Sequence, residues 1–134
     1  MDRQIHPAML LHDRLPAVYT AHSAYTAFMK HHICQFVLQQ NCVPINPFMN
    51  FEYFLLDVVP RDVVRRGNNT YVHIVDEIWT FGVIADGVLE EIRLARKLSK
   101  PVRHFSLGKR LDTIKELEPS NLEYEKGVCR IEDI

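Results

Sequence analysis

One carboxylate, Glu91, falls on the side of a predicted helix that should be buried. Residues 84–98 give the clearest helical pattern in the chain. Five of them share one stripe with spacings of four, three, four and three: Ile84, Val88, Glu91, Ala95 and Leu98. The opposite side is charged and suits solvent. Because burying an unpaired carboxylate is costly, Glu91 requires either a buried partner (an Arg, a Tyr or a backbone amide) or a pocket that opens beside it.

Two further acidic positions could do chemistry. Asp76 lies just before the predicted strand 78–81; capping a turn is its ordinary role, and pointing into a cleft is the alternative. Asp86 and Gly87 open the helix 84–98. An Asp there favours the helix N-terminus by capping and by its charge, and a Gly allows a ligand or a strand to approach the backbone closely.

Other candidate residues follow the first two predicted strands. Tyr19 ends the first strand and suits half-buried packing, and His22 and Ser23 follow it, where Ser23 can cap a helix. Pro47 and Phe48 come after the second strand. Ligands of parallel sheets bind beyond the carboxyl ends of the strands. We therefore expect these segments to surround any pocket.

The aromatic group at residues 48–54 has three interpretations. It contains Phe48, Phe51, Tyr53 and Phe54. Such a group is more often part of a core than a wall that stacks on a base. A third possibility is an exposed contact surface, which would need Phe48, Phe51 and Phe54 to form one contiguous patch.

Strands and helices alternate along the chain. The predicted strands are 17–20, 43–47, 78–81 and 101–105, and the predicted helices are 24–40, 61–75, 84–98 and 110–118. Residues 48–62 read as a loop plus a short helix that ends at Pro60. This order predicts an α/β protein: a single-domain three-layer sandwich with a mostly parallel, flavodoxin- or Rossmann-like sheet. Residues 1–16 would be an N-terminal extension, residues 17–118 the domain and residues 119–134 a tail.

Composition disfavours several classes of function. The formal net charge is −1, and no basic stripe suggests a nucleic acid polymer as a partner. Three cysteines without a CxxC pair predict neither a disulfide framework nor a metal site. No glycine-rich phosphate loop is present, so we expect no dinucleotide or ATP cofactor. The lack of a long apolar run predicts a cytoplasmic protein without a signal peptide or membrane span.

Three stretches together resemble the nucleoside 2-deoxyribosyltransferase-like superfamily, and most of all its small phage and bacterial members of unassigned function. They are Val75–Gly82, Ile84–Ala95 and Lys100–Val102. Asp76, Gly87, Glu91 and Ala95 have the family's order and spacing. Val18–Ala21 is similar to the family's first strand with its Tyr, and Pro44–Pro47 to its second strand with its Pro. The resemblance spans about residues 17–106.

The resemblance implies an enzyme that cleaves or exchanges the N-glycosidic bond of nucleosides or nucleotides. Glu91 would be the nucleophile and form a glycosyl-enzyme intermediate. Tyr19 would orient its carboxylate, and Asp76 would contact the base and help protonate the leaving nitrogen. His22, Ser23, Pro47, Phe48, Asp86 and Gly87 would line the substrate site. The resemblance also implies a homo-oligomer.

Two alternatives to the enzyme stay open. Ala85 stands where the transferases carry an Asp and the small relatives often a Ser, which favours a nucleotide-binding module without turnover. An interaction protein that uses the aromatic segment is the other alternative. Access of solvent to Glu91 distinguishes the enzyme from the binding module.

Overall fold

A five-stranded, mostly parallel sheet forms the centre of the molecule. The computed structural model describes residues 4–108, 110 and 113–134. The strands are β1 (Ala17–His22), β2 (Val43–Ile45), β3 (Glu77–Phe81), β4 (Val102–Phe105) and β5 (Glu116–Leu117). Their order is β2-β1-β3-β4-β5, and only β5 is antiparallel to its neighbour. This order is typical of flavodoxin-like doubly wound sheets and confirms the predicted fold class.

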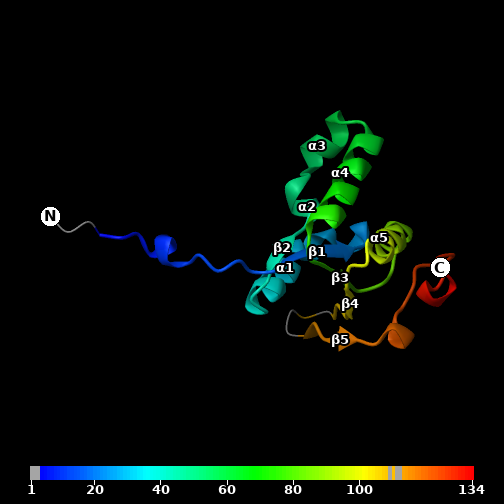
Figure 1. Cartoon of the computed structure of the whole chain (residues 1–134). Helices are drawn as coiled ribbons and strands as arrows, with labels where there is room; N and C mark the ends of the chain where they lie inside the picture. Colours follow the sequence, from blue (N-terminus) through cyan, green and yellow to red (C-terminus); the bar gives the residue numbers. More distant parts are fainter. Residues whose placement is uncertain (1–3, 109, 111–112) are drawn as a thin grey trace.

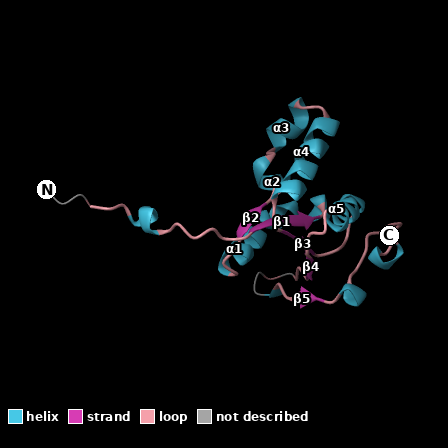
Figure 2. Ribbon diagram, in the orientation of Figure 1, coloured by secondary structure: helices cyan, strands magenta, loops and turns pink. Residues whose placement is uncertain are grey.

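Helices cover both faces of the sheet (Figures 1 and 2). The longer ones are α1 (Lys30–Gln39), α4 (Arg61–Ile74) and α5 (Asp86–Lys97). The short helices α2 (Pro47–Asn50) and α3 (Tyr53–Val58) connect β2 to α4, and the 3-10 helix η2 (Ala24–Met29) precedes α1. Helix α1 packs on one face, and α4 and α5 contribute to a second core on the other. These are the three layers of the sandwich.

Alternation along β1 divides the strand between the two cores. Val18 packs with α1, whereas Tyr19 and Ala21 pack on the α4 and α5 side. β1 pairs with β2 on one side and with β3 on the other. A central position leaves Tyr19 without exposed surface, and it fixes the carboxyl end of β1 beneath the loops that follow β1 and β2.

Helix α4 buries only part of the face that its sequence pattern marks. A helical wheel of residues 61–75 places Val63, Gly67, Thr70, Tyr71 and Ile74 on one face. In the structure Gly67 and Tyr71 are half-buried, whereas the exposed fractions of Val63 and Ile74 are 55% and 63%. The buried residue of the helix is Val72. Helices α3 and α4 together project from the body of the protein (Figure 1). The contacts of α4 with α5 and with Phe51 therefore decide which face is covered, and these contacts are not visible in the pattern of α4 alone.

The predicted helix 110–118 is wrong at its end. Glu116 and Leu117 form β5, which pairs antiparallel with β4. The Glu116 carboxylate also forms an ion pair with Arg103 at a distance of 2.7 Å. This pairing overrides the local helical preference. Residues 111 and 112 of that prediction lie outside the described residues.

The C-terminal tail belongs to the core on the α5 side. Leu122 and Ile131 are buried there, and Tyr124 bridges Ile84 through the backbone. Arg96 of α5 donates a 2.9 Å hydrogen bond to the carbonyl of Ile131. The predicted division between domain and tail therefore crosses one continuous core.

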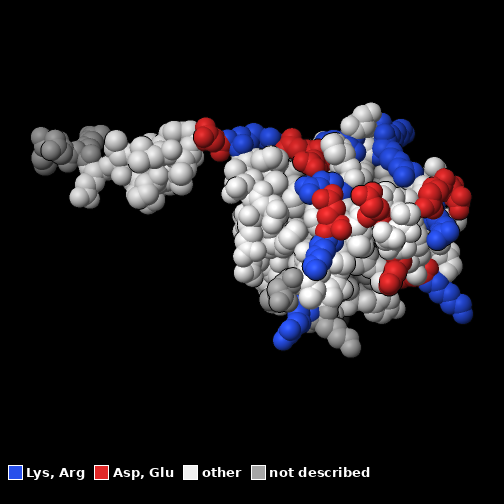
Figure 3. Space-filling model, turned by 90° about the horizontal axis from the view of Figure 1, so that it is seen from below, with Lys and Arg blue, Asp and Glu red and all other residues white. Residues whose placement is uncertain are grey.

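The N-terminal extension runs away from the body of the protein, and the surface beside it is mixed in charge. Figure 3 shows basic and acidic side chains interspersed on the face seen from below. In the part of the chain that the structure describes, no helix has both the length and the apolarity to cross a membrane.

Replacing Ile131 with Ala should lower the free energy of unfolding by about 2–5 kcal/mol, because its side chain is 2% exposed within the core. Ile5→Ala is the matched control, since Ile5 lies in the extension and is 65% exposed. Urea denaturation of both variants measures the difference. Equal, small losses would contradict a core role for the tail.

Candidate functional site

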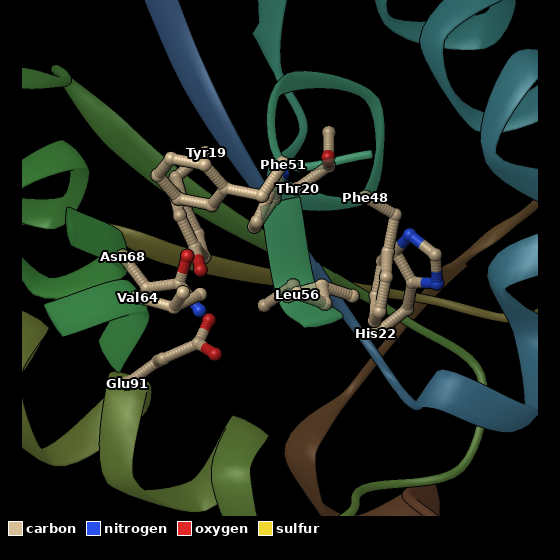
Figure 4. A pocket seen from close by; sticks show the side chains of 11 residues that line it. Tyr19, Thr20, His22, Phe48, Phe51, Leu56, Val64, Asn68 and Glu91 are labelled. Carbon is tan, nitrogen blue, oxygen red and sulfur yellow. The ribbon is translucent and has the colours of Figure 1, made fainter. Parts of the chain in front are cut away.

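A small pocket with a cavity volume of about 70 Å³ lies at the carboxyl end of β1 (Figure 4). Small-molecule sites span roughly 300–1,000 Å³, so a ligand of that size would occupy this pocket with only part of its structure. β1 contributes four consecutive residues, and the remaining ones come from α2 to α5 and the loop after α2. The lining residues are Tyr19, Thr20, Ala21, His22, Pro47, Phe48, Phe51, Leu56, Val64, Asn68 and Glu91.

Three buried polar atoms in this pocket have no hydrogen-bond partner among the described residues. They are the Tyr19 hydroxyl oxygen, Asn68 Oδ1 and Glu91 Oε2. In Figure 4 the three polar groups point toward one another. Buried polar atoms are satisfied in most native structures, and an unsatisfied one costs about 1–3 kcal/mol. A cluster of three in one pocket is therefore a polar site suited to a ligand.

Helix α5 directs Glu91 to this cluster through its helical period. Ile84, Val88 and Ala95, which share the stripe, are buried as predicted. Glu90, one residue earlier, is exposed and lies 3.7 Å from Arg93 in an ion pair. The two adjacent glutamates therefore lie in different environments. Glu91 keeps part of its surface accessible while its Oε2 is buried.

The surroundings of Glu91 favour its neutral form. Burial raises the pKa of its carboxyl from 4.5 to about 7, and the nearby Tyr19 hydroxyl opposes part of this rise. Burial, and then the charge of Glu91, raise the pKa of Tyr19 far above its usual range. The Tyr19 hydroxyl thus keeps its proton and can donate it in a hydrogen bond. Glu91 is therefore partly protonated near neutral pH, and its ionised form is the one that can act as a nucleophile.

Asn46 organises the other side of the pocket. It is buried, caps α2 and accepts hydrogen bonds at Oδ1 from the backbone N–H groups of Phe48 and Met49. Its amide nitrogen must then donate, and it lies 2.8 Å from Thr20 Oγ1 and 3.0 Å from His22 Nε2. His22 Nε2 therefore accepts a hydrogen bond.

The hydrogen bonds of His22 fix its tautomer. The Thr26 hydroxyl donates to the carbonyl of Ser23, so its oxygen accepts from His22 Nδ1 at 3.0 Å. Both ring nitrogens are occupied, and the proton lies on Nδ1. Burial lowers the pKa of His22 to about 4, which agrees with a neutral ring. His22 therefore presents a neutral aromatic surface to the pocket.

Aromatic rings form the apolar wall. The His22 and Phe48 rings are 4.9 Å apart, and Phe51 lies 5.6 Å from the Tyr71 ring. Gly67 of α4 makes room for Phe51, because a Cβ there would lie 2.8 Å from Phe51 Cζ. Phe48 and Phe51 thus line the pocket instead of an outer patch. The side chain of Phe54 lies outside the described residues.

Five predicted site residues meet in the pocket: Tyr19, His22, Pro47, Phe48 and Glu91. Asp76 does not join them. It accepts a 2.7 Å hydrogen bond from the Ala17 N–H and pairs with Arg14 at 2.9 Å. These two contacts hold the pKa of Asp76 below its usual range. The expectation that Asp76 contacts a ligand here is corrected, because a residue before β3 lies at the amino edge of the sheet.

Three other predicted residues also lie outside the pocket lining. Ser23 caps η2 and donates a 2.8 Å hydrogen bond to Glu125 of the tail. Asp86 is exposed in the first turn of α5, where its charge suits the helix dipole. Gly87 has open space around a hypothetical Cβ, so the expected close approach to its backbone is absent.

Asn46 and Asn68 are the polar site residues that sequence reasoning missed. Asn46 carried a usable signal, because an Asn followed by Pro47 is a typical N-cap with Pro at the first helical position. Asn68 lies on a face of α4 that its own pattern does not mark as inward. The described residues contain no group of three or more His, Cys, Asp or Glu side chains placed to hold a metal ion.

A family model described as a domain of unknown function (DUF7768) matches residues 19–105. This range includes most of β1, all of β2 to β4 and every residue that lines the pocket. No curated protein matches the chain.

The free energy of unfolding should fall as the pH rises from about 4.5 through about 7, because the folded protein holds the Glu91 proton more tightly than the unfolded chain does. The loss due to Glu91 is roughly 3 kcal/mol. Glu91→Gln should lack this component, and the exposed neighbour variant Glu90→Gln should keep it. Urea denaturation at pH 5 and pH 8 measures both. Identical pH dependence in wild type and Glu91→Gln would show that Glu91 ionises normally.

Asn46→Asp should raise the pKa of His22 by about 1–3, since a carboxylate within hydrogen-bond reach favours the imidazolium. The Asp keeps the acceptor for the α2 amides but replaces the donor that faces Nε2. Titration of the His22 ring protons by NMR measures the change. Asn50→Asp, at an exposed position of α2, is the control. An unchanged His22 titration in Asn46→Asp would refute the assigned tautomer.

Proposed function

We propose that this chain, which belongs to the family described as a domain of unknown function (DUF7768), cleaves the N-glycosidic bond of a nucleoside or nucleotide with Glu91 as the nucleophile. The observation that carries the proposal is the position of Glu91: a half-buried glutamate beside Tyr19, in a pocket with aromatic walls. The aromatic rings suit a flat base, and the polar cluster suits a sugar.

The proposed reaction has two displacements at the anomeric carbon. A Glu91 oxygen attacks this carbon and forms an ester bond as the bond to the base nitrogen breaks. The electron pair of that bond goes to the base, which takes up a proton. Water then attacks the anomeric carbon, loses a proton and releases the carboxylate. A second nucleobase in place of water would give transfer instead of hydrolysis.

In this scheme Glu91 is the nucleophile and Tyr19 positions it. The Tyr19 hydroxyl keeps its proton, so it can orient the carboxylate by donating a hydrogen bond once substrate has excluded water. Asp76 lies at the opposite edge of the sheet and has no part in the scheme. The leaving base therefore takes its proton from another donor, such as solvent.

A binding module without turnover is the second candidate. Its support comes from Ala85, which precedes α5 and provides no side-chain hydrogen bond to the first turn. Accessible surface on Glu91 favours the enzyme over this alternative.

Base release should depend on Glu91 and not on Glu90. We expect wild type to release a nucleobase from at least one member of a panel of nucleosides and 5′-monophosphates, as measured by chromatography. Glu91→Ala and Glu91→Gln should lose at least about 100-fold in kcat/KM, because no carboxylate can attack. Glu90→Gln, with its exposed side chain, should retain activity. Added free base separates transfer from hydrolysis.

If no base is released, calorimetry with the same panel measures whether the folded protein binds any of these compounds. Binding without base release by folded wild type would support the binding module and contradict the enzyme. Activity that persists in Glu91→Gln would contradict the assigned nucleophile.

A further inference from the structure

Helix α4 brings an amide, Asn68, to the reacting end of the pocket. Its Oδ1 is buried and has no partner among the described residues, and it lines the pocket with Tyr19 and Glu91. Figure 4 shows the nitrogen of the Asn68 amide on the side of the Glu91 carboxylate and its oxygen on the side of the Tyr19 hydroxyl. An amide oxygen is an acceptor only, so this position calls for a hydrogen-bond donor.

The other polar side chains of the pocket do not supply that donor. The Thr20 hydroxyl donates to the carbonyl of Ile45, and His22 has both ring nitrogens occupied. The Tyr19 hydroxyl forms no hydrogen bond with Asn68 within the described structure. A ligand group is therefore the natural source of the donor.

One ligand hydroxyl could satisfy Asn68 Oδ1. A hydroxyl donates one hydrogen, so it can donate to Asn68 Oδ1 while the Tyr19 hydroxyl donates to the Glu91 carboxylate. A Glu91 oxygen then remains for the anomeric carbon. The ligand hydroxyl must be close to that carbon, because Asn68 lies beside Tyr19 and Glu91 in the same pocket (Figure 4). On a nucleoside, the 2′-hydroxyl is bonded to the carbon next to the anomeric one.

We propose that Asn68 is a specificity residue that accepts a hydrogen bond from the 2′-hydroxyl, so that the pocket takes ribonucleosides in preference to 2′-deoxyribonucleosides. The inference rests on the proposed function. A 2′-deoxy sugar would fill the same space but leave Asn68 Oδ1 buried and unpaired. Sites built to bind a hydroxyl reject analogues that lack it for this reason.

The test compares nucleosides that carry the same base and differ only at carbon 2 of the sugar. Wild type should cleave the ribonucleoside with a kcat/KM at least about 10-fold higher than that of the 2′-deoxyribonucleoside. The comparison is made with wild-type protein, so it does not depend on the folding of any variant. A 3′-deoxyribonucleoside, which retains the 2′-hydroxyl, should resemble the ribonucleoside more closely.

Variants then assign the preference to Asn68. Asn68→Leu, close in size but without an acceptor, should bring the ribo to 2′-deoxy ratio near one. Asn68→Asp, which keeps an acceptor, should retain part of it. Asn69→Leu is the matched control, because the neighbouring Asn69 is exposed, and its ratio should equal that of wild type.

Three results would overturn the inference, and they are distinguishable from failure of the proposed function. Equal cleavage of the two sugars by wild type would overturn it, as would a preference for the 2′-deoxy sugar. A ratio that Asn68→Leu leaves unchanged would do the same. In all three, nucleosides are still cleaved and the proposed function stands. If wild type neither binds nor cleaves any nucleoside, the proposed function and this inference fail together.

Discussion

The site depends on one unfavourable arrangement, the burial of a carboxyl group that has no cationic partner among the described residues. Glu91 lies among the apolar residues of α5, and a neutral tyrosine is its nearest polar neighbour on β1. Water would stabilise its charge far better than this environment does. The surrounding sheet and helices provide the stability that tolerates the arrangement, which is a common cost of active sites. The rigid pairing of β1 between β2 and β3 keeps Tyr19 in place beside it.

Two asparagines, at opposite ends of the pocket, act in different ways. Asn46 is fully engaged: its amide joins β1 to α2 and determines the protonation of His22. Asn68 has a buried Oδ1 without a hydrogen-bond partner among the described residues. The first therefore stabilises the pocket wall, and the second is available to a ligand. The segment between β2 and β3 supplies both Asn68 and Phe51, so it shapes the pocket as much as the sheet does.

Periodicity was enough to predict an α/β fold with a mostly parallel sheet and the inward direction of Glu91, because both depend on local sequence repeats that the fold preserves. Asn68 could not be found this way, since the inward face of α4 is set by its contacts with α5 and with Phe51. Asp76 was predicted for the wrong edge of the sheet: its place before β3 puts it at the amino end, away from ligands. Glu116 forms part of a strand because its backbone pairs with β4, and the sequence pattern of residues 110–118 alone does not show this contact.

Both edges of the sheet resist extension. β2 spans three residues and includes Pro44, which has no N–H to donate, and β5 spans only two residues. Neither edge provides a continuous ladder of free backbone groups for an added strand. This feature disfavours edge-to-edge pairing between the sheets of two copies. If copies of this chain associate, we therefore expect the contact to form through helices or loops. The central sheet would then not continue from one copy into the next.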